Sequence, residues 1–357
     1  MTQDQQATMA PPAGAPVLDG VQILHPLDPL TAEEIRGATR AVRGAHPELA
    51  GAPIALIVLR DPPKATVVNF IGSGPIARLA RVVVFDRSAS TTYEADVTLA
   101  PVAAGSAANA DMTAEVTAWR HVPGVYPVVV AEMFEEVSKA GLADERVIKA
   151  LARRGFEDLS KVRLLAPPAG DYPPNRAGRN LGWGTCNLQE DPRDSMFARP
   201  IEGIRVLVDL DSLEIIEVDD GPVIPVTEER GRFMEPEDVG GWRDDIAPLE
   251  IVQPEGPGFT MKGNEIAWQD WRLHASLHPV DGLVLSHVRF RDGDQERQIL
   301  YRGSLSEMIV PYGDTDPNYY WRTYFDAGEF GLGRLANALT LGCDCRKHSP
   351  GVTREIT

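Results

Sequence analysis

Positions 324–333 hold the residues best suited to chemistry, in the sequence YFDAGEFGLG. Asp326 stands two residues after Tyr324 and just ahead of a glycine-rich bend. Its apolar neighbours would partly remove the carboxylate from water, which makes it a stronger base toward a carbon acid. Periodicity alone favours the other interpretation, a solvated turn aspartate that caps Gly328. The stretch is therefore a candidate proton-abstracting site.

The glycines at 328, 331 and 333 could also suggest a phosphate-binding loop. No G-x-x-x-x-G-K follows them, and no alternation of strand and helix surrounds them. Glycines at this spacing more plainly let the backbone turn where side chains would collide. We expect a tight bend rather than a nucleotide site.

Two histidines, His274 and His278, have the four-residue spacing of metal ligands on a helix. The surrounding alternation of apolar and polar residues predicts a strand instead, in which residues four apart stand about 13 Å apart. A shared metal ion is therefore not expected. His121 and His287 are lone histidines, for which ordinary polar or packing roles are expected.

The elements that must position Asp326 predict an α+β protein. Thr31 precedes Glu33 and Glu34 at the start of a helix with Ile35, Ala38 and Val42 on one face. Strand-like runs follow and the plan then repeats, with a small-residue linker at 100–111 and a hairpin near 211–212. The expected parts are a disordered leader (1–18), a first small α/β domain with a helix on an antiparallel sheet (19–105), a second such domain (106–221), a connector (222–263), and the incomplete beginning of a large antiparallel β-sandwich (264–357).

Charge and composition limit the partners. The chain carries 35 Lys and Arg against 52 Asp and Glu, a formal charge of -17. Nucleic acid and anionic membrane surfaces attract basic proteins, so neither is expected as a partner. Three cysteines are too few for a secreted disulfide framework, and no secretory signal or membrane-length apolar run is seen. A cytoplasmic protein is expected.

Positions 310–345, VPYGDTDPNYYWRTYFDAGEFGLGRLANALTLGCDC, resemble the start of the catalytic domain of copper-containing primary-amine oxidases. In that family V-P-Y-G-D, Y-F-D-x-G-E and L-G-C-D-C follow one another at matching intervals. The pieces HPLDPLTAEEI, ADERVIKALARRGFEDLSKVRL and ARPIEGIRVLVDLDSLEIIEVDD resemble the two small α/β domains of the same family. The resemblance covers roughly residues 25–345.

The resemblance implies a reaction of a primary amine with O2 and water that gives an aldehyde, ammonia and hydrogen peroxide. Asp326 matches the aspartate that removes the proton from the α-carbon of the amine, and Tyr324 matches the gate of the substrate channel. The family's substrate-contacting segment matches Phe325, Ala327, Gly328, Glu329, Phe330, Gly331, Leu332, Gly333, Arg334 and Leu335. Phe134 and Phe197 fall where related bacterial enzymes place aromatic lining residues, with core packing equally open for each. Together with Phe330 they favour an aromatic or medium alkyl amine over a polyamine, and full-length relatives are homodimers.

The sequence departs from the family at its cofactors, which are copper and a topaquinone made from a tyrosine. No T-x-x-N-Y-[DE] follows Asp326, and no His-x-His pair is present. TDPNYY, at 315–320, imitates the quinone motif, but its sixth residue is Tyr320 and it precedes YFDAGE, so Tyr319 is expected to be an ordinary tyrosine. We expect a truncated chain that holds neither cofactor, has a free thiol at Cys345 and is inactive alone. The alternative is a non-catalytic binding or assembly module made of the two small domains.

Overall fold

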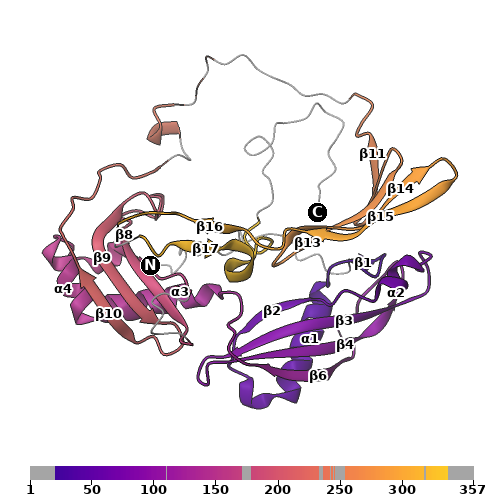
Figure 1. Ribbon diagram of the computed structural model, residues 1–357, viewed down its shortest axis with the longest axis horizontal. Coiled ribbons are helices and arrows are strands. Elements are labelled where there is room, and N and C mark those ends of the chain that lie inside the picture. The colour runs from indigo at the N-terminus through magenta and orange to yellow at the C-terminus, as the bar shows by residue number, and fades with distance from the viewer. Residues whose placement is uncertain are drawn as a thin grey trace.

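The computed structural model describes residues 21–109, 111–170, 178–232, 236–241, 243, 245, 254–316 and 319–336. Two small domains, each with helices on one antiparallel sheet, precede a larger antiparallel sheet that starts the third part (Figure 1). The expected fold class is confirmed. The leader at 1–18 and Cys345, the residue expected to be a free thiol, lie outside the described residues.

In the first domain, helix α1 (Ala32–Ala45) packs on a sheet with the strand order β2-β3-β4-β6. Ala38 and Val42 of α1 are buried with Val82 and Val97 of the sheet, whereas Ile35 lies at the rim and is 37% exposed. The strands are β2 (Ile54–Leu59), β3 (Pro75–Asp86), β4 (Thr91–Ala103) and β6 (Ala114–Val122). Smaller elements are β1 (Gln22–Ile23), β5 (Ser106–Ala107), α2 (Lys64–Val68) and the 3-10 turn η1 (Pro47–Leu49).

The start of α1 is fixed by a capping box and a buried ion pair. Thr31 Oγ1 accepts from the Glu34 N–H, and Glu34 Oε2 accepts from the Thr31 N–H. Glu34 also binds Arg78 of β3 at 2.8 Å, with both side chains fully buried. The predicted cap thus also ties the helix to the sheet.

The first sheet extends beyond the boundary expected at residue 105. Strand β4 continues to Ala103, β5 pairs with β1, and β6 pairs with β4 from Ala114 to Val122. Residues 100–103 and 106–107 of the stretch expected to be a linker are therefore strand residues of the first domain. The small and mostly uncharged residues of this stretch do not indicate strands by their composition. The strands become evident only from their pairing with neighbouring strands.

In the second domain, α3 (Ala131–Ala143) and α4 (Glu145–Arg153) cover a sheet with the strand order β10-β9-β8-β7 (Figure 1). Its core includes Val137, Leu151, Leu164, Val206 and Val208. The hairpin between β9 and β10 spans the expected turn at 211–212. The remaining elements are η2 (Leu159–Lys161), β7 (Val162–Leu165), β8 (Leu181–Leu188), β9 (Pro200–Asp209) and β10 (Ile215–Asp220).

The third part is an antiparallel meander of five strands, β11 to β15, followed by a short hairpin and one turn of π-helix. Strand β11 lies within the stretch expected to be a connector. A 3-10 turn, η4 (Pro236–Asp238), precedes it. The elements are β11 (Phe259–Lys262), β12 (Glu265–Trp268), β13 (Trp271–His278), β14 (Gly282–Asp292), β15 (Gln295–Ser304), β16 (Ile309–Pro311), β17 (Thr323–Phe325) and η5 (Asp326–Phe330).

The third part contacts both small domains. His274 Nε2 of β13 lies 2.9 Å from Asp28 Oδ1 of the first domain, and Asn264 Nδ2 donates to the same oxygen at 3.1 Å. Trp321, 3% exposed, packs with Trp183 and Leu207 on the sheet of the second domain. Among the residues described here, no helix is both long and apolar enough to cross a membrane.

Candidate active site

Asp326 is the first residue of η5, at the point where strand β17 ends. Its N–H donates to the Met308 carbonyl at 3.0 Å, and its carbonyl accepts from the Gly331 N–H at 3.0 Å. The residue is half-buried. The aspartate therefore sits at the head of a closed, hydrogen-bonded turn and not on a fully hydrated loop.

Glu307 lies directly against this turn. Its Oε1 accepts from the Ala327 N–H at 2.9 Å, and its Oε2 accepts from the Gly328 N–H at 3.0 Å. The first N–H groups of a helical turn have no partner within the turn, so this carboxylate supplies one. No local sequence pattern marks Glu307, because it lies 20 residues before Ala327 in the chain.

Glu329 is the carboxyl group with the most altered acidity in the turn. Burial raises its pKa to about 7, and the charges of Glu307 and Asp326 add to the rise, whereas a hydrogen bond from the Phe325 N–H opposes it. That bond, to Glu329 Oε2, is 3.3 Å long. From the sequence, Glu329 was expected only as part of the substrate-contacting segment. Its apolar neighbours are the signal that could have indicated burial of its carboxyl group.

Aromatic rings surround the same turn. Tyr324 packs edge-on against Tyr312 at 5.6 Å and against Phe330 at 6.1 Å, measured between ring centroids. Burial raises the pKa of the Tyr324 hydroxyl. Phe325 on the other face of β17 is 39% exposed, whereas Ala327 is 1% exposed. The turn thus has an aromatic side that includes the tyrosine expected to be a gate.

The glycines of the turn are required by close backbone contacts. A Cβ at Gly333 would lie 2.1 Å from the His278 carbonyl oxygen, and one at Gly331 would lie 2.7 Å from that of Pro279. Gly331 also has a φ of 82°, which favours glycine. The expectation that these glycines prevent collisions is confirmed. Leu332 and Arg334 continue the contact by donating their N–H groups to Val280 and Pro279, and Leu335 is 43% exposed.

The second domain holds the other side of the turn. The Val129 N–H donates to the Glu329 carbonyl at 2.7 Å, and Arg334 Nη1 donates to the Val129 carbonyl at 2.9 Å. Phe134, on α3, packs against the core of the second domain. Phe197 is 69% exposed, in the loop between β8 and β9.

A cavity of about 310 Å³ opens beside Gly328 and Glu329, where both small domains meet the turn. Its wall is mainly apolar, and its two arginines are already paired, Arg87 with Glu136 and Arg179 with Asp209. The apolar lining includes Pro53, Phe85, Val128, Val130, Met133 and Leu181. A small molecule with an apolar body would fit next to the turn that Asp326 starts.

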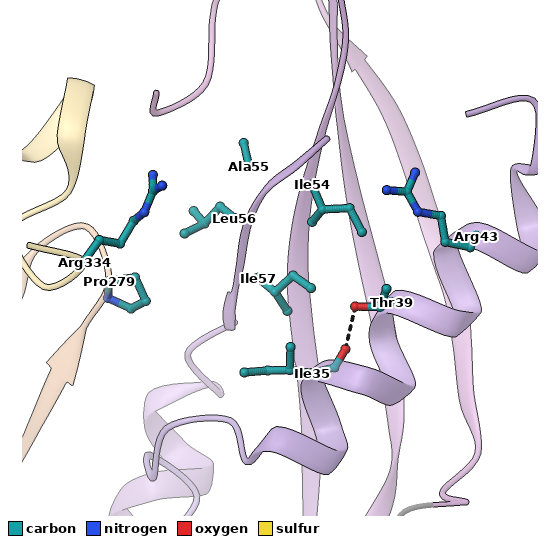
Figure 2. Close-up of a pocket in the computed structure, with 9 residues that line it drawn as sticks. All are labelled: Ile35, Thr39, Arg43, Ile54, Ala55, Leu56, Ile57, Pro279 and Arg334. Atoms are coloured by element: carbon teal, nitrogen blue, oxygen red, sulfur yellow. Dashed lines mark hydrogen bonds between the residues drawn. The ribbon is translucent and has the colours of Figure 1, made fainter. Parts of the chain in front are cut away.

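A second depression, of about 410 Å³, lies between β2, α1 and the end of the third part. Figure 2 shows Pro279 and Arg334 on one side of it, opposite Leu56 of β2, with Ile35 and Thr39 of α1 on the other. The depression is open to solvent and borders the far end of the glycine-rich stretch. Asp326 is not among the residues that line this depression or the 310 Å³ cavity, which reaches the turn at Gly328 and Glu329.

Each of the remaining chemical candidates is buried or lies against a neighbouring group. His274 is buried against Asp28, and His278 Nδ1 accepts from the Val280 and Asp281 N–H groups. Tyr319 lies under the Arg322 guanidinium, 4.1 Å from the ring centroid. Cys186 is buried and free. In the part of the chain that the structure describes, no three His, Cys, Asp or Glu residues gather as a metal site.

Comparison with known proteins gives a consistent assignment along the chain. Residues 25–104 match the family model of the copper amine oxidase N2 domain, residues 132–236 that of the N3 domain, and residues 260–350 that of the copper amine oxidase enzyme domain. The three matches follow the order of the three parts of the fold.

Curated relatives agree with these matches. A primary amine oxidase of Arthrobacter sp. (strain P1) is 35% identical over 325 residues, which are 91% of this chain and 48% of the relative. A histamine oxidase of Arthrobacter globiformis is 35% identical over 323 residues, 90% of this chain and 45% of the relative. A peroxisomal copper-containing diamine oxidase of Nicotiana tabacum is 34% identical over 366 residues, 93% of this chain and 46% of the relative. The chain spans about half the length of the curated relatives it matches.

A solved structure supports the same fold. The copper-containing benzylamine oxidase of Hansenula polymorpha superposes with a TM-score of 0.69 over 90% of this chain and 50% of the benzylamine oxidase, at 23% identity. Family models over all three parts, relatives above 30% identity over nine-tenths of the chain and the shared fold point to one conclusion. The chain belongs to the copper amine oxidase family.

Proposed function

We propose that this chain provides the amine-binding and proton-abstracting part of a copper- and quinone-dependent primary-amine oxidase. The observation that carries the proposal is Asp326 at the head of a closed turn whose Gly328 and Glu329 line an apolar cavity, in a chain of this family. Oxidation of a primary amine by O2 and water gives an aldehyde, ammonia and hydrogen peroxide. Its difficult step is removal of a proton from carbon, for which a positioned base is needed.

In this proposal Asp326 takes the proton from the α-carbon of the bound amine. Tyr324 and Phe330 exclude water from one side of the turn, because their rings pack edge to face. The cavity beside Gly328 and Glu329 receives the apolar body of the amine. Exclusion of water strengthens the interaction of the carboxylate with the amine cation, since charges attract more strongly in a medium of low dielectric constant.

The cofactors of the family supply an electrophile that acidifies the α-carbon and the means to pass electrons to O2. The residues of this chain do not fit either cofactor. Its seven histidines include no His-x-His pair, and His274 and His278 are engaged with Asp28 and with backbone N–H groups. We therefore assign copper and the quinone to residues outside this sequence and propose that the 357-residue chain alone has no turnover.

The substrate class in this proposal is a primary amine with an aromatic or medium alkyl body. The cavity wall supports it, because its lining is mainly apolar and its arginines are neutralised by acids. A polyamine would leave a second ammonium group against apolar side chains, which is costly. The partners proposed are the amine, O2 and a second copy of the complete enzyme, in the cytoplasm.

Peroxide release tests the proposal. The purified chain with added copper and benzylamine should release none. The same residues, fused within the matched enzyme domain to the remaining part of the Arthrobacter primary amine oxidase, should release peroxide and aldehyde once copper and quinone contents are confirmed. Asp326→Asn in the fusion should lower the rate by ~10²–10⁴. Copper-dependent turnover by the chain alone would refute the assignment of the cofactors, and an unchanged rate in the variant would refute the base.

A further inference from the structure

One carboxylate, that of Glu307, accepts hydrogen bonds from three backbone N–H groups near Asp326. Its Oε1 accepts from the Met308 N–H at 2.9 Å and from the Ala327 N–H at 2.9 Å, and its Oε2 accepts from the Gly328 N–H at 3.0 Å. The Met308 carbonyl in turn accepts from the Asp326 N–H at 3.0 Å. Glu307 and Met308, the two residues before β16, therefore bind the backbone on both sides of the Asp326 Cα. Met308 binds the N–H of Asp326, and Glu307 binds the N–H of the next residue.

The geometry also explains Gly328. A Cβ at this position would lie 2.8 Å from Glu307 Oε2, so a side chain here would push the carboxylate away. Hydrogen bonds to an ionised acceptor are stronger than neutral ones. Two of them on successive N–H groups fix the rotation of both peptide planes that follow Asp326.

We propose that Glu307 is a positioning residue for Asp326. Its carboxylate caps the start of η5 and so fixes the backbone from which the Asp326 side chain is presented to the amine. The inference rests on the proposed base role of Asp326 and adds to it the residue that keeps the base in place. Glu307 makes no contact with substrate in this scheme, and it acts only through the turn.

The charge of Glu307 also acts on the turn. Burial is the main cause of the raised pKa of Glu329, and the Glu307 charge adds to it. Removal of that charge should lower the pKa of Glu329, and water that enters a loosened turn would lower it further, because burial is the main cause of the rise. The titration of Glu329 is therefore a local reporter of Glu307.

The test uses the 357-residue chain, labelled for NMR, with Glu307→Gln, Glu307→Ala and the control Glu296→Gln, which removes a charge from β15, in the five-stranded sheet of the third part. In Glu307→Ala, hydrogen exchange at the Ala327 and Gly328 amides should speed up by roughly 10- to 100-fold, because each amide loses a charged hydrogen bond. Glu307→Gln keeps one acceptor oxygen and should fall between this variant and wild type. In both variants the titration midpoint of Glu329 should fall, and the Asp326 carboxyl resonance should broaden in Glu307→Ala.

The control variant should change none of these three signals. Wild-type protection of both amides in Glu307→Ala, or an unmoved Glu329 midpoint in both variants, would overturn the proposal. Neither readout requires turnover. If Asp326 proved not to be the base, these signals would still respond to Glu307, so the two failures are separable.

Discussion

The backbone N–H of Val129 donates a hydrogen bond to the carbonyl oxygen of Glu329 over 2.7 Å. Val129 lies just before α3 of the second domain, and its own carbonyl accepts from Arg334 at 2.9 Å. The turn that starts at Asp326 is thus held by the second domain on one side and by Glu307 and Met308 on the other. Changes on either side should reach Asp326 through the backbone.

Replacement of Glu329 by Gln should change how stability depends on pH. The folded-state pKa of about 7 lies above the ordinary value of 4.5, so the stabilising contribution of this group is full below pH 4.5 and is lost as pH rises through 7. Gln cannot ionise, so Glu329→Gln should not show this loss. The difference in free energy of unfolding should be roughly 1–2 kcal/mol after allowance for partial exposure. Urea midpoints at pH 5 and pH 8 measure it.

The exposed Glu255→Gln is the matched control and should shift both midpoints equally. If Glu329→Gln also shifts both midpoints equally, the carboxyl is not protonated in the folded protein at pH 5 to 7.

Replacement of Gly331 or Gly333 by Ala should destabilise the third part. The new Cβ would meet a carbonyl oxygen at 2.7 Å or 2.1 Å, and Gly331 has a positive φ. Each change should cost about 2–4 kcal/mol in free energy of unfolding. Gly44→Ala, in the exposed end of α1 with nothing within 4 Å, is the control and should gain up to ~1 kcal/mol. Equal effects of all three changes would contradict the close packing of the bend.

His25 should make the protein sensitive to mild acid. Burial, aided by the neighbouring His274, lowers its pKa from 6.5 to about 4. The unfolded chain therefore binds a proton first, and stability that is full above pH 6.5 is lost as pH falls toward 4. Gln does not take up a proton, so His25→Gln should reduce this acid-induced loss in free energy of unfolding by roughly 1–2 kcal/mol.

Thermal melting between pH 7 and pH 4.5 measures the effect, with the exposed His121→Gln as control. Asp28, beside His25, adds a separate loss at lower pH: burial opposes its ionisation, but hydrogen bonds from His274 and Asn264 lower its pKa to about 2. A His25→Gln protein with the same acid sensitivity as wild type would show that His25 is not the cause.

Arg78→Ala should strongly destabilise the first domain. It would leave the carboxylate of Glu34 fully buried without its partner, which costs about 3–5 kcal/mol. Arg291→Ala breaks an exposed contact with Asp270 and should cost less than ~1 kcal/mol. Circular dichroism during urea unfolding distinguishes them, and a small effect of Arg78→Ala would show that water reaches Glu34.

Local features of the fold were predictable from the sequence, and long-range ones were not. The Thr31 cap depends on residues three apart, and the glycine bend on spacing within ten residues. The pairing of β6 with β4 and the contact of His274 with Asp28, 246 residues apart, leave no local pattern. A strand of ordinary composition is recognised only when its partner is known.

The same distinction holds in the candidate site. Asp326 and Tyr324 could be proposed from the sequence because the motif that carries them is contiguous. Glu307 could not, because only the folded hairpin brings its carboxylate to the amides of Ala327 and Gly328. The altered acidity of Glu329 likewise depends on burial by the second domain and on two other carboxylates.

In the proposed reaction Asp326 removes the α-proton of a primary amine. This role is tested by the rate at which benzylamine, with and without deuterium at the α-carbon, reduces the quinone of the fused oxidase without oxygen. We expect a rate ~10²–10⁴ lower in Asp326→Asn than in wild type at equal copper and quinone content, with C–H cleavage limiting. An unchanged rate with an unchanged isotope effect in Asp326→Asn would contradict it.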